Sequence, residues 1–599
     1  MSDPAPRFSP RPSRAAEIAW LPFGPEAFAQ ARRQGRPLLL AIGAVWCHWC
    51  HVMDETSYSD ERVLALLRDR FVAVRVDRDQ RPDVDRRYNQ GGWPTTCVLN
   101  AAGSLLWGAT YVPPDAFARV LARLADAYAQ DPSLAEALPP AAAREDGAGA
   151  LARAAAEGSG EGLAAVVDAV LVAMAALEDR HFGGFGREGP KFPQAESLGF
   201  ILALAPWPGP RAESARAMLA RALDGMLAGE LEDRVEGGFY RYATQPDWRE
   251  PHYEKMLWDN ALLASAYLRA GARAGEARWL EAGRRALAFL DGVLWQESVV
   301  AYAMSQDADE EYARLDLPGR RARSAPYLDT VVYADGNLVM VETLVDAWAV
   351  SGDEGALRRA ARLWDGLTER LYRPGEGFLH CDAGPAREVM DQVLALGAAL
   401  ALEPLGRPRD LALARSVADD LLATGAAEGR LVERPLGGWQ GPESWRGAPA
   451  MPLVAEGGRA ARHLLALGRR LGDERYARAA RRLVEGLSAE AGRLGTFGAD
   501  LARAAWHFRS PVTVRVAAPA AGAAAVASLF AAARRSAVEP LAIALLGRDE
   551  AEAEGLSAGE AGAAYACLGE VCAAPASHAS ELVEAIRGLV ARSGSELVW

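Results

Sequence analysis

At 599 residues the chain is too long for a single hydrophobic core, and about two or three domains are expected. Half of the residues are hydrophobic, and no apolar run reaches the roughly 18 residues that a membrane span needs, so no membrane partner is expected. The formal net charge is −13 without a basic run, which argues against nucleic acid as a partner. Six cysteines and a start unlike a signal peptide predict a cytoplasmic protein.

A Cys-x-x-Cys pair follows the first strand-like run of the chain. Residues 37–42 predict a buried strand, residues 60–67 a helix and residues 71–77 a second strand. Cys47 and Cys50 lie within this strand–helix–strand unit, which is typical of thioredoxin-type redox proteins. One thiolate attacks a disulfide and the other resolves the mixed disulfide. Because a helix N-terminus lowers the pKa of a thiol, Cys47 is the expected nucleophile and Cys50 the resolving residue.

Four neighbours complete the predicted redox site. His48 is expected to raise the thiolate fraction when protonated, or to relay a proton at neutral pH. Trp46 and Trp49 are expected to shield the sulfurs from water. Pro94 opens another strand-like run, which is typical of an edge strand or a cis bond, and a thioredoxin fold places a cis-proline loop opposite the redox pair.

Ordinary thioredoxins carry a buried carboxylate side chain six residues before the first cysteine, and this chain lacks it. Ala41 occupies that position. The proton of Cys50 is therefore expected to pass to His48, to water, or to Asp54 or Glu55.

Other interpretations of the cysteine pair remain open. The domain could bind partners without turnover, or the cysteines could be structural. Zinc is a further alternative, because Cys47, Cys50 and His51, with Cys97 as a fourth ligand, are residue types that zinc accepts. The preferred interpretation needs no metal and no cofactor.

From about residue 161 the chain predicts one helix after another, with apolar residues at helical spacing. A glycine–aromatic motif separates pairs of helices, with a weaker match at 299–302. Six such units favour a closed (α/α)6 toroid over an open solenoid. The predicted helices are 163–177, 215–231, 261–272, 279–294, 338–350, 360–371, 389–402, 411–422, 460–471 and 476–487, and the motifs are 183–185, 237–239, 375–378, 437–439 and 495–497.

The loops of this helical part hold the polar and aromatic residues of a candidate pocket. Aromatic rings beside carboxylates suit a small polyhydroxylated ligand such as a carbohydrate, and paired carboxylates can serve as general acid and base. Alternatively, the motifs stabilise the toroid and their charged residues form structural ion pairs. The candidates are Lys191, Tyr240, Arg241, Trp248, His252, Glu254, Lys255, Asp259, Asp307 and Asp309.

Only two of the 66 Lys and Arg residues are lysines, Lys191 and Lys255. Both lie in these loops. An ammonium is compact whereas a guanidinium is planar and wide, so one hypothesis is that the two loops require a small cation. The other is chance.

The last segment, from about residue 511, differs again. Residues 512–516, 541–546 and 564–572 predict strands and residues 582–589 a helix, which together indicate a small α/β element. Its two cysteines, at 567 and 572, are expected to be buried, inert thiols.

Five motifs carry a resemblance to a known family: residues 41–43, 47–53, 76–78, 81–85 and 91–94. With them the chain resembles the thioredoxin-domain family of spermatogenesis-associated protein 20. The resemblance implies a thioredoxin-like domain followed by a six-hairpin glycosidase-like toroid. The expected boundaries are 15–135 for the thioredoxin-like domain, 136–160 for a linker, 161–510 for the toroid and 511–599 for the small α/β element.

The working hypothesis is a thioredoxin-like thiol–disulfide oxidoreductase acting on protein disulfide clients, fused to a toroid that binds a polyhydroxylated ligand. One alternative is a non-catalytic ligand-binding or redox-sensing protein. Another is a glycosidase or epimerase in the toroid, with His252, Glu254 and Asp307 as its first candidates.

Overall fold

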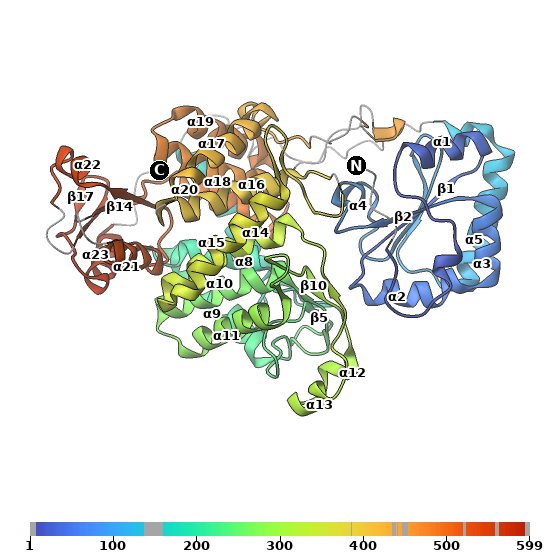
Figure 1. The fold of residues 1–599 in the computed structure, drawn as a ribbon, viewed down its shortest axis with the longest axis horizontal. Coiled ribbons are helices and arrows are strands. Elements are labelled where there is room, and N and C mark those ends of the chain that lie inside the picture. The colour runs from blue at the N-terminus through green and yellow to red at the C-terminus, as the bar shows by residue number, and fades with distance from the viewer. Residues whose placement is uncertain are drawn as a thin grey trace.

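The computed structural model describes residues 7–136, 160–384, 386–405, 407–433, 439, 441–445, 453–518, 523–557 and 562–593. An N-terminal α/β domain, a helical toroid and a small C-terminal α/β domain follow one another along the molecule (Figure 1). The predicted fold class is confirmed. Most of the expected linker, and Gly437 and Gly438 of one motif, lie outside the described residues.

The N-terminal domain is built on a four-stranded sheet of order β2-β1-β3-β4. Strand β1 pairs parallel with β2 and antiparallel with β3, and β3 pairs antiparallel with β4. This is the thioredoxin-like topology that the sequence predicts. The elements are β1 (Leu38–Gly43), β2 (Val72–Asp77), β3 (Thr95–Leu99), β4 (Leu105–Ala109), α1 (Pro25–Gln34), α2 (His48–Glu55), α3 (Glu61–Arg70), α4 (Pro82–Tyr88) and α5 (Pro114–Gln130).

Both faces of this sheet are covered, which explains why β1 reads as a continuous apolar run. Leu39 and Ala41 point into one core, which Phe117 of α5 also fills. Leu38 and Leu40 point into the opposite core, which also contains residues of the helices α1 and α4. The covered sheet holds the carboxyl end of β1, from which the Cys-x-x-Cys segment emerges, in one fixed position.

The toroid consists of an inner and an outer ring of helices. Each inner helix packs against the next, and α20 packs against α8, which closes the ring within the described residues. The inner helices are α8 (Ala195–Leu204), α10 (Leu257–Ala274), α14 (Ala334–Ser351), α16 (Val389–Leu402), α18 (Val454–Leu471) and α20 (Ala499–His507). The outer helices are α7 (Gly160–Leu177), α9 (Pro210–Ala228), α11 (Ala277–Phe289), α15 (Glu354–Leu371), α17 (Pro408–Ala423) and α19 (Glu474–Leu487).

Every helix predicted in this part is present, and the structure adds α8 and α20. Helix α8 is short and apolar on nearly every side, so it lacks the amphipathic period by which the other helices are found in the sequence. Helix α20 has only nine residues, most of them buried. Both belong to the inner ring, where neighbours surround a helix and no polar face is needed.

Short ladders precede the inner helices and form the end of the toroid that meets the N-terminal domain (Figure 1). They place the loops that the sequence analysis singled out around this end. They comprise β5 (Tyr242–Ala243), β6 (Pro251–His252), β7 (Lys255–Met256), β8 (Trp295–Gln296), β9 (Ala301–Tyr302), β10 (Ser305–Gln306), β11 (Leu328–Asp329), β12 (Tyr372–Arg373) and β13 (Gly377–Phe378), with α12 (Glu310–Ala313) and α13 (Leu317–Arg321) alongside.

The C-terminal sheet has the order β15-β14-β16-β17, with β14 parallel to β15 and antiparallel to β16. Strand order and directions repeat those of the N-terminal sheet, so the chain ends in a second domain of thioredoxin-like topology. No cysteine stands in residues 518–522, after β14, where the first domain has its pair. The elements are β14 (Val512–Ala517), β15 (Leu541–Leu546), β16 (Ala563–Leu568), β17 (Val571–Cys572), α21 (Ala523–Arg535), α22 (Arg548–Ala553) and α23 (Ala579–Arg592).

The expectation that Cys567 and Cys572 are inert, buried thiols is wrong. The two residues face each other across β16 and β17 and form a disulfide with an S–S distance of 2.04 Å. Cys572 is exposed. The hairpin register brings the two sulfurs together, and the five-residue spacing by itself does not reveal that register.

Within the described residues, no helix combines the length and apolarity that crossing a bilayer requires.

Candidate functional site

The Cys47–Cys50 disulfide lies at the N-terminus of α2. Cys47 is the N-cap residue, and its sulfur accepts a hydrogen bond from the Cys50 amide at 3.2 Å. Each cysteine is only 5% exposed. Gly43, at the end of β1, allows this approach, because a Cβ there would lie 3.3 Å from the Cys50 sulfur. The helix N-terminus favours the thiolate of Cys47 after reduction.

Tryptophans and a cis-proline surround the disulfide. Trp46 is buried and donates a hydrogen bond from Nε1 to Asp79 at 2.6 Å. The Trp93–Pro94 peptide bond is cis, and the ring of Trp93 meets that of Trp46 edge-on with 5.9 Å between centroids. Trp49 is 46% exposed on the first turn of α2. Of the two predicted shields, Trp46 is therefore the one buried beside the sulfurs.

Toroid residues cover the redox pair. Met256 of β7 packs in one apolar cluster with Cys47, Cys50 and Trp46. The Arg241 guanidinium lies over the Trp46 ring, 4.4 Å from its centroid, and 5.3 Å from that of Trp93. This is the side of a thioredoxin fold on which the cis-proline loop faces the redox pair, and here the toroid occupies it.

Polar contacts hold the two domains together around this cover. His51 Nε2 lies 3.1 Å from both carboxylate oxygens of Asp307 in the toroid. Arg7 donates to Asp77 of β2 at 3.0 Å and to Asp329 of β11 at 2.6 Å. His380 Nε2 lies 2.6 Å from the backbone oxygen of Asp79. The redox pair thus sits in an interface that is sealed on several sides.

The alternative zinc site finds no support in the positions of its proposed ligands. His51 contacts Asp307, and the Cys97 thiol donates to the Tyr88 carbonyl at 3.4 Å. Burial raises the pKa of Cys97 to about 12, which disfavours the thiolate that a metal needs. Across the described part of the chain, no three His, Cys, Asp or Glu residues are grouped to hold a metal ion.

Asp54, Glu55 and His48 were the side chains expected to accept the proton of Cys50, and they differ in whether another group already binds them. Arg75 engages Asp54 through two bonds of 2.8 and 2.7 Å, which ties up both carboxylate oxygens. Glu55 pairs with Arg11 at 3.9 Å. Burial, reinforced by the charge of Arg11, lowers the pKa of His48, so its imidazole is neutral at neutral pH. This favours the proton-relay interpretation of His48 over the charged one.

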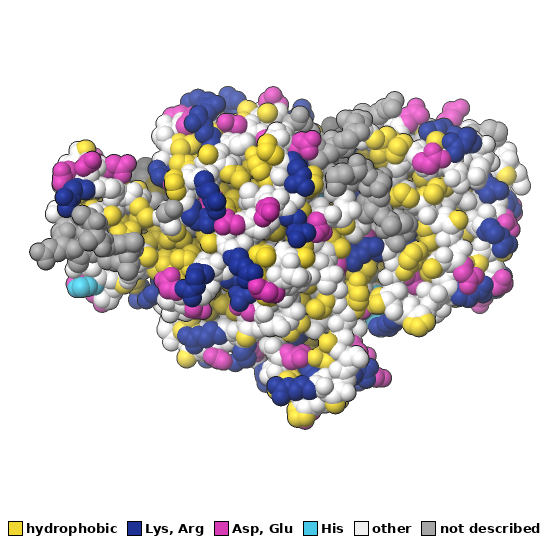
Figure 2. All heavy atoms as spheres, in the orientation of Figure 1, with side chains coloured by type: hydrophobic (Ala, Val, Ile, Leu, Met, Phe, Trp, Pro, Cys, Tyr) yellow, Lys and Arg dark blue, Asp and Glu magenta, His cyan; other side chains and the backbone are white. Residues whose placement is uncertain are grey.

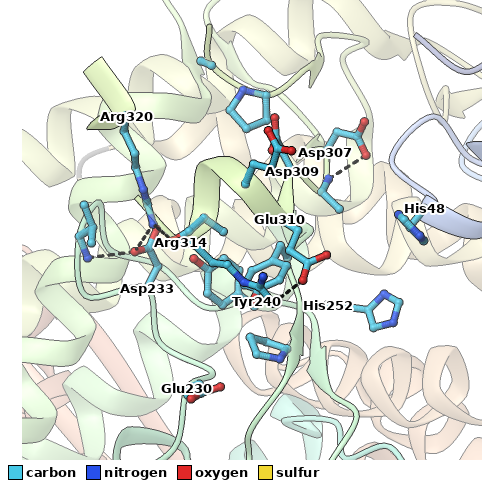
Figure 3. Close-up of a pocket in the computed structure, with 18 of the residues that line it drawn as sticks. His48, Glu230, Asp233, Tyr240, His252, Asp307, Asp309, Glu310, Arg314 and Arg320 are labelled. Atoms are coloured by element: carbon cyan, nitrogen blue, oxygen red, sulfur yellow. Dashed lines mark hydrogen bonds and ion pairs between the residues drawn. The ribbon is translucent and has the colours of Figure 1, made fainter. Parts of the chain in front are cut away.

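A cavity of about 1540 Å³ adjoins the redox pair between the two domains (Figure 3). His48 and Trp49 line it from α2, and the His48 ring lies 6.4 Å from the ring of His252 across the interface. The toroid contributes aromatic, acidic and basic side chains, among them Tyr240, Tyr253, Asp307, Asp309, Glu310, Arg314 and Arg320. Of the candidate pocket residues, the structure therefore brings Tyr240, His252, Asp307 and Asp309 together.

The carboxylates among the candidates have different surroundings. Asp309 caps α12 by accepting from the Tyr312 amide at 2.9 Å. Glu254 is 2% exposed and does not line the cavity. Its burial opposes ionisation, but the hydrogen bond to His252 and the charge of Arg241 prevail and lower its pKa. Asp259, half-buried on the first turn of α10, has its pKa raised to about 7 by burial and by the charge of Glu196.

The two lysines occupy equivalent structural positions outside the cavity. Lys191 Nζ bonds to Asp179 at 2.6 Å and to the Gly183 carbonyl at 3.1 Å. Lys255 Nζ bonds to Asp233 at 2.5 Å and to the Gly237 carbonyl at 2.8 Å. In both, one ammonium joins an aspartate to the glycine turn four residues later, which supports the hypothesis of a required small cation.

Trp248 also belongs to the framework. It is 1% exposed, and its Nε1 donates to the Phe182 carbonyl at 3.0 Å. Its ring packs under Gly184, where a Cβ would lie 2.5 Å away. Trp248, Lys191 and Lys255 thus shape the glycine–aromatic turns.

Sequence reasoning missed Arg7, Met256 and Arg320. Arg320 lies between the lysine network and the cavity, donating to Asp233 at 2.6 Å and to Glu236 at 2.9 Å. Met256 follows the candidate residue Lys255 directly, but nothing local in the sequence indicates that it packs on the disulfide. The same holds for Arg7, whose partners stand 70 and 322 residues away.

Comparison with known proteins agrees with the thioredoxin-like fold of the N-terminal domain. A family model named Thioredox_DsbH and described as "Protein of unknown function, DUF255" matches residues 11–139. Spermatogenesis-associated protein 20 of Homo sapiens is 33% identical over 333 residues, which are 52% of this chain and 41% of the human protein. Uncharacterized protein B0495.5 of Caenorhabditis elegans is 34% identical over 269 residues, 42% of this chain and 36% of that protein. The matched part is less than half the length of each relative.

Among solved structures, a sugar epimerase from a ruminal bacterium aligns with a TM-score of 0.43 at 13% identity, over 54% of this chain and 86% of that one. Cellobiose 2-epimerase from Spirochaeta thermophila DSM 6192 aligns with a TM-score of 0.44 at 15% identity, over 56% of this chain and 84% of that one. The family model covers the thioredoxin-like domain and the curated relatives extend over about half of the chain. The chain's resemblance to the spermatogenesis-associated protein 20 family, indicated by its motifs, is confirmed.

Proposed function

We propose that this protein is a thiol–disulfide redox protein whose Cys47–Cys50 pair exchanges with small thiols and disulfides rather than with folded protein clients. One observation carries the proposal. The pair has the helix N-terminus and the cis-Pro94 loop that exchange chemistry uses, yet Met256 and Arg241 cover the face on which a folded client would dock. A small molecule can instead approach the disulfide through the cavity that His48 and Trp49 line.

The exchange is balanced as two thiol–disulfide displacements. A small thiolate attacks the Cys47 sulfur, the Cys47–Cys50 bond breaks, and Cys50 leaves as a thiolate. A second small thiolate attacks the outer sulfur of the mixed disulfide, which releases Cys47 as a thiolate and yields the oxidised small disulfide. Two electrons enter the protein, and the two thiolates take up two protons. The N-terminus of α2 stabilises the Cys47 thiolate, and neutral His48 accepts or returns a proton.

The test compares two oxidants on the reduced, full-length protein. Oxidised glutathione and insulin are each mixed with it, and the Cys47–Cys50 state is followed by alkylation and mass spectrometry. We expect reversible exchange with glutathione at a reduction potential near that of the cytosolic glutathione pool, roughly −200 to −300 mV. The rate of exchange with insulin should be lower by at least about tenfold. Replacing His48 by Ala should slow resolution of the mixed glutathione disulfide several-fold.

Two variants make this test specific. Cys47→Ser removes the expected nucleophile and should abolish exchange, whereas Cys97→Ser changes a buried thiol outside the site and should leave it intact. A pair that stays oxidised with glutathione over that whole range of potentials would sink the proposal. Equal rates with insulin and glutathione would refute the selection for small molecules.

A second candidate concerns the cavity itself. Tyr240, His252 and Tyr253 line it beside the carboxylates of Asp309 and Glu310, which is the combination that stacks on and hydrogen-bonds a polyhydroxylated ligand. We propose binding there, without assigning turnover, since Asp307 is engaged by His51 and Glu254 lies outside the cavity. Titration with neutral disaccharides tests this, and Tyr253→Ala should weaken any binding found.

A further inference from the structure

A second cavity, of about 490 Å³, lies between the toroid and the C-terminal domain. Helices α10, α14, α16, α18 and α20 line it on one side, and β14, β15 and α21 on the other. Its lining is rich in arginine. Figure 2 shows basic and acidic side chains interspersed over the visible face of the toroid, whereas the cavity is lined by seven arginines and four carboxylates. The arginines are Arg269, Arg462, Arg469, Arg470, Arg503 and Arg534, with Arg515 on β14.

Most of the cavity's carboxylates are already paired. Glu539 accepts from Arg269 at 2.5 Å, from Arg503 at 2.6 Å, and contacts His507 at 3.0 Å. Asp346 accepts from Arg534 at 2.6 Å. Glu403 accepts from Arg470 at 2.8 Å. Each of these arginines contacts a carboxylate, but Arg269 and Arg503 share the single negative charge of Glu539. Glu342 also lines the cavity and makes no ion pair within the described residues.

Two arginines of α18 are left over. Arg462 makes no hydrogen bond or ion pair within the described residues, and its buried Nε has no partner. Arg469 donates only to the backbone oxygens of His507 and Arg509, at 2.8 and 3.2 Å. Positions 462 and 469 are seven residues apart and therefore share one face of the helix. Burial and the charge of the nearby Arg503 lower the pKa of Arg462 to about 10, although the charges of Glu342, Glu539 and Asp500 oppose this shift.

An unpartnered histidine stands beside them. His463 is 6% exposed, lines the cavity, and its Nε2 has no hydrogen-bond partner in the described structure. Burial and the charge of Arg462 hold its pKa well below the ordinary value, so the ring is neutral. Buried polar groups are normally hydrogen-bonded and buried charges balanced. Here the buried Nε2 of His463 and the buried Nε of Arg462 lack hydrogen-bond partners within the described residues, and both residues line one cavity beside the exposed Arg469.

We propose that this cavity binds a small phosphorylated molecule, with its phosphate group between Arg462 and Arg469 and hydrogen-bonded to His463. Guanidiniums offer paired donors that match phosphate oxygens, and the lining holds seven arginines against four carboxylates, which favours an anionic ligand. Neutral His463 can donate through Nε2, or accept from a protonated phosphate oxygen. The volume is that of a metabolite-sized ligand. The site is separate from the Cys47–Cys50 pair and does not rest on the redox proposal.

The test is a calorimetric and thermal-unfolding titration of the full-length protein. Inorganic phosphate and glucose 6-phosphate are the probes, glucose is the uncharged control, and sodium chloride matches the ionic strength. Both phosphates should bind and raise the unfolding temperature, while glucose and chloride should not. Arg462→Gln should weaken phosphate binding by at least about tenfold, because it removes a charge-assisted, bidentate contact.

The variants separate binding from folding. Arg462 has no direct ion pair within the described residues, so the ligand-free Arg462→Gln protein should be at least as stable as the wild type. Arg475→Gln is the matched control, since Arg475 is exposed on the neighbouring α19 and pairs with Asp473 at 2.8 Å. It should retain full phosphate affinity. The proposal is overturned if neither phosphate binds, or if Arg462→Gln binds as the wild type does.

Discussion

At the scale of single residues, Asp259 shows how the domain interface changes a side chain's chemistry. It lies half-buried on the first turn of α10, and burial and the negative charge of Glu196 raise its pKa to about 7. Arg241 and Arg78, one from each domain, oppose this shift without cancelling it. A carboxyl group that is ionised in most proteins at neutral pH is therefore half-protonated here.

This shift predicts a pH-dependent stability. Between an unfolded pKa of about 4 and the folded pKa of about 7, the native state holds a proton that the unfolded state has released. Raising the pH through this range therefore destabilises the protein. Asp259→Asn should remove that loss, leaving the variant more stable than the wild type at pH 8, by an amount on the order of 4 kcal/mol, and no different at pH 4.

Urea unfolding at a series of pH values measures this difference. A wild-type and variant pair whose stabilities differ equally at pH 4 and pH 8 would contradict the assignment. Glu236→Gln provides a comparison, because that carboxylate is paired with Arg320.

At the scale of structural elements, the glycine–aromatic motifs form a repeated lock between a turn and an inner helix. Asn260 of α10 bonds both backbone groups of Phe239, at 2.6 and 3.0 Å. Asn337 of α14 does the same to Tyr302, at 2.8 and 3.1 Å. Gln392 of α16 does so to Phe378, at 2.8 Å for both bonds. The weak match at 299–302 is thus a true member of the series.

The lysines belong to the same turns. In the 375–378 turn an arginine replaces them: Arg387 donates from Nε to the Glu376 carbonyl at 2.7 Å, and pairs with Asp420 on the outer helix α17. In this turn the guanidinium of Arg387 reaches a carboxylate on a neighbouring helix. In the two lysine turns the aspartate lies four residues before the glycine, and the shorter reach of an ammonium is enough.

Lys255→Arg should therefore destabilise the protein, by about 2 kcal/mol or more, because the wider guanidinium overfills a site that is 1% exposed. Chemical unfolding followed by far-UV circular dichroism measures the change. Arg475→Lys on the surface of α19 is the reverse substitution at an exposed pair and should cost less than about 0.5 kcal/mol. Equal effects of the two substitutions would show that the turn does not select the smaller cation.

At the scale of the whole molecule, the toroid and the N-terminal domain share one functional region. Arg7, His51 and Met256 link them around the Cys47–Cys50 disulfide. The other end of the toroid carries the C-terminal domain, whose sheet repeats the same strand order without a matching cysteine pair. One thioredoxin-like unit therefore places the Cys47–Cys50 disulfide against the toroid, and the other closes an arginine-lined cavity.

Loosening the first interface should expose the disulfide. Arg7→Ala removes the cation that joins Asp77 to Asp329 and leaves two buried carboxylates facing each other. We expect the Cys47–Cys50 bond to be reduced several-fold faster by a phosphine, measured by alkylation and mass spectrometry. Arg14→Ala alters a nearby exposed arginine that pairs with Glu17, and should leave the rate unchanged. An unaltered rate in Arg7→Ala would mean that this contact does not govern access.

The sequence by itself determined the elements and their order. Residues 37–42 could be recognised as a strand because burial on both faces leaves a continuous apolar run, and residues 71–77 because their side chains alternate. The amphipathic outer helices could be recognised because one side faces water. The Cys-x-x-Cys spacing and the position of Pro94 likewise predicted a thioredoxin-like domain. These signals are local, since each depends on residues within one or two helical turns or along one strand.

Only the tertiary structure decided what these elements face. Met256 and Arg241 lie on the disulfide, Cys567 meets Cys572, and Arg462 and His463 point into a shared cavity because distant segments pack together. Helix α8 gave no periodic signal, because an inner helix surrounded by others needs no polar face. Such contacts depend on packing and register across hundreds of residues, and neither leaves a mark in the local spacing of side chains.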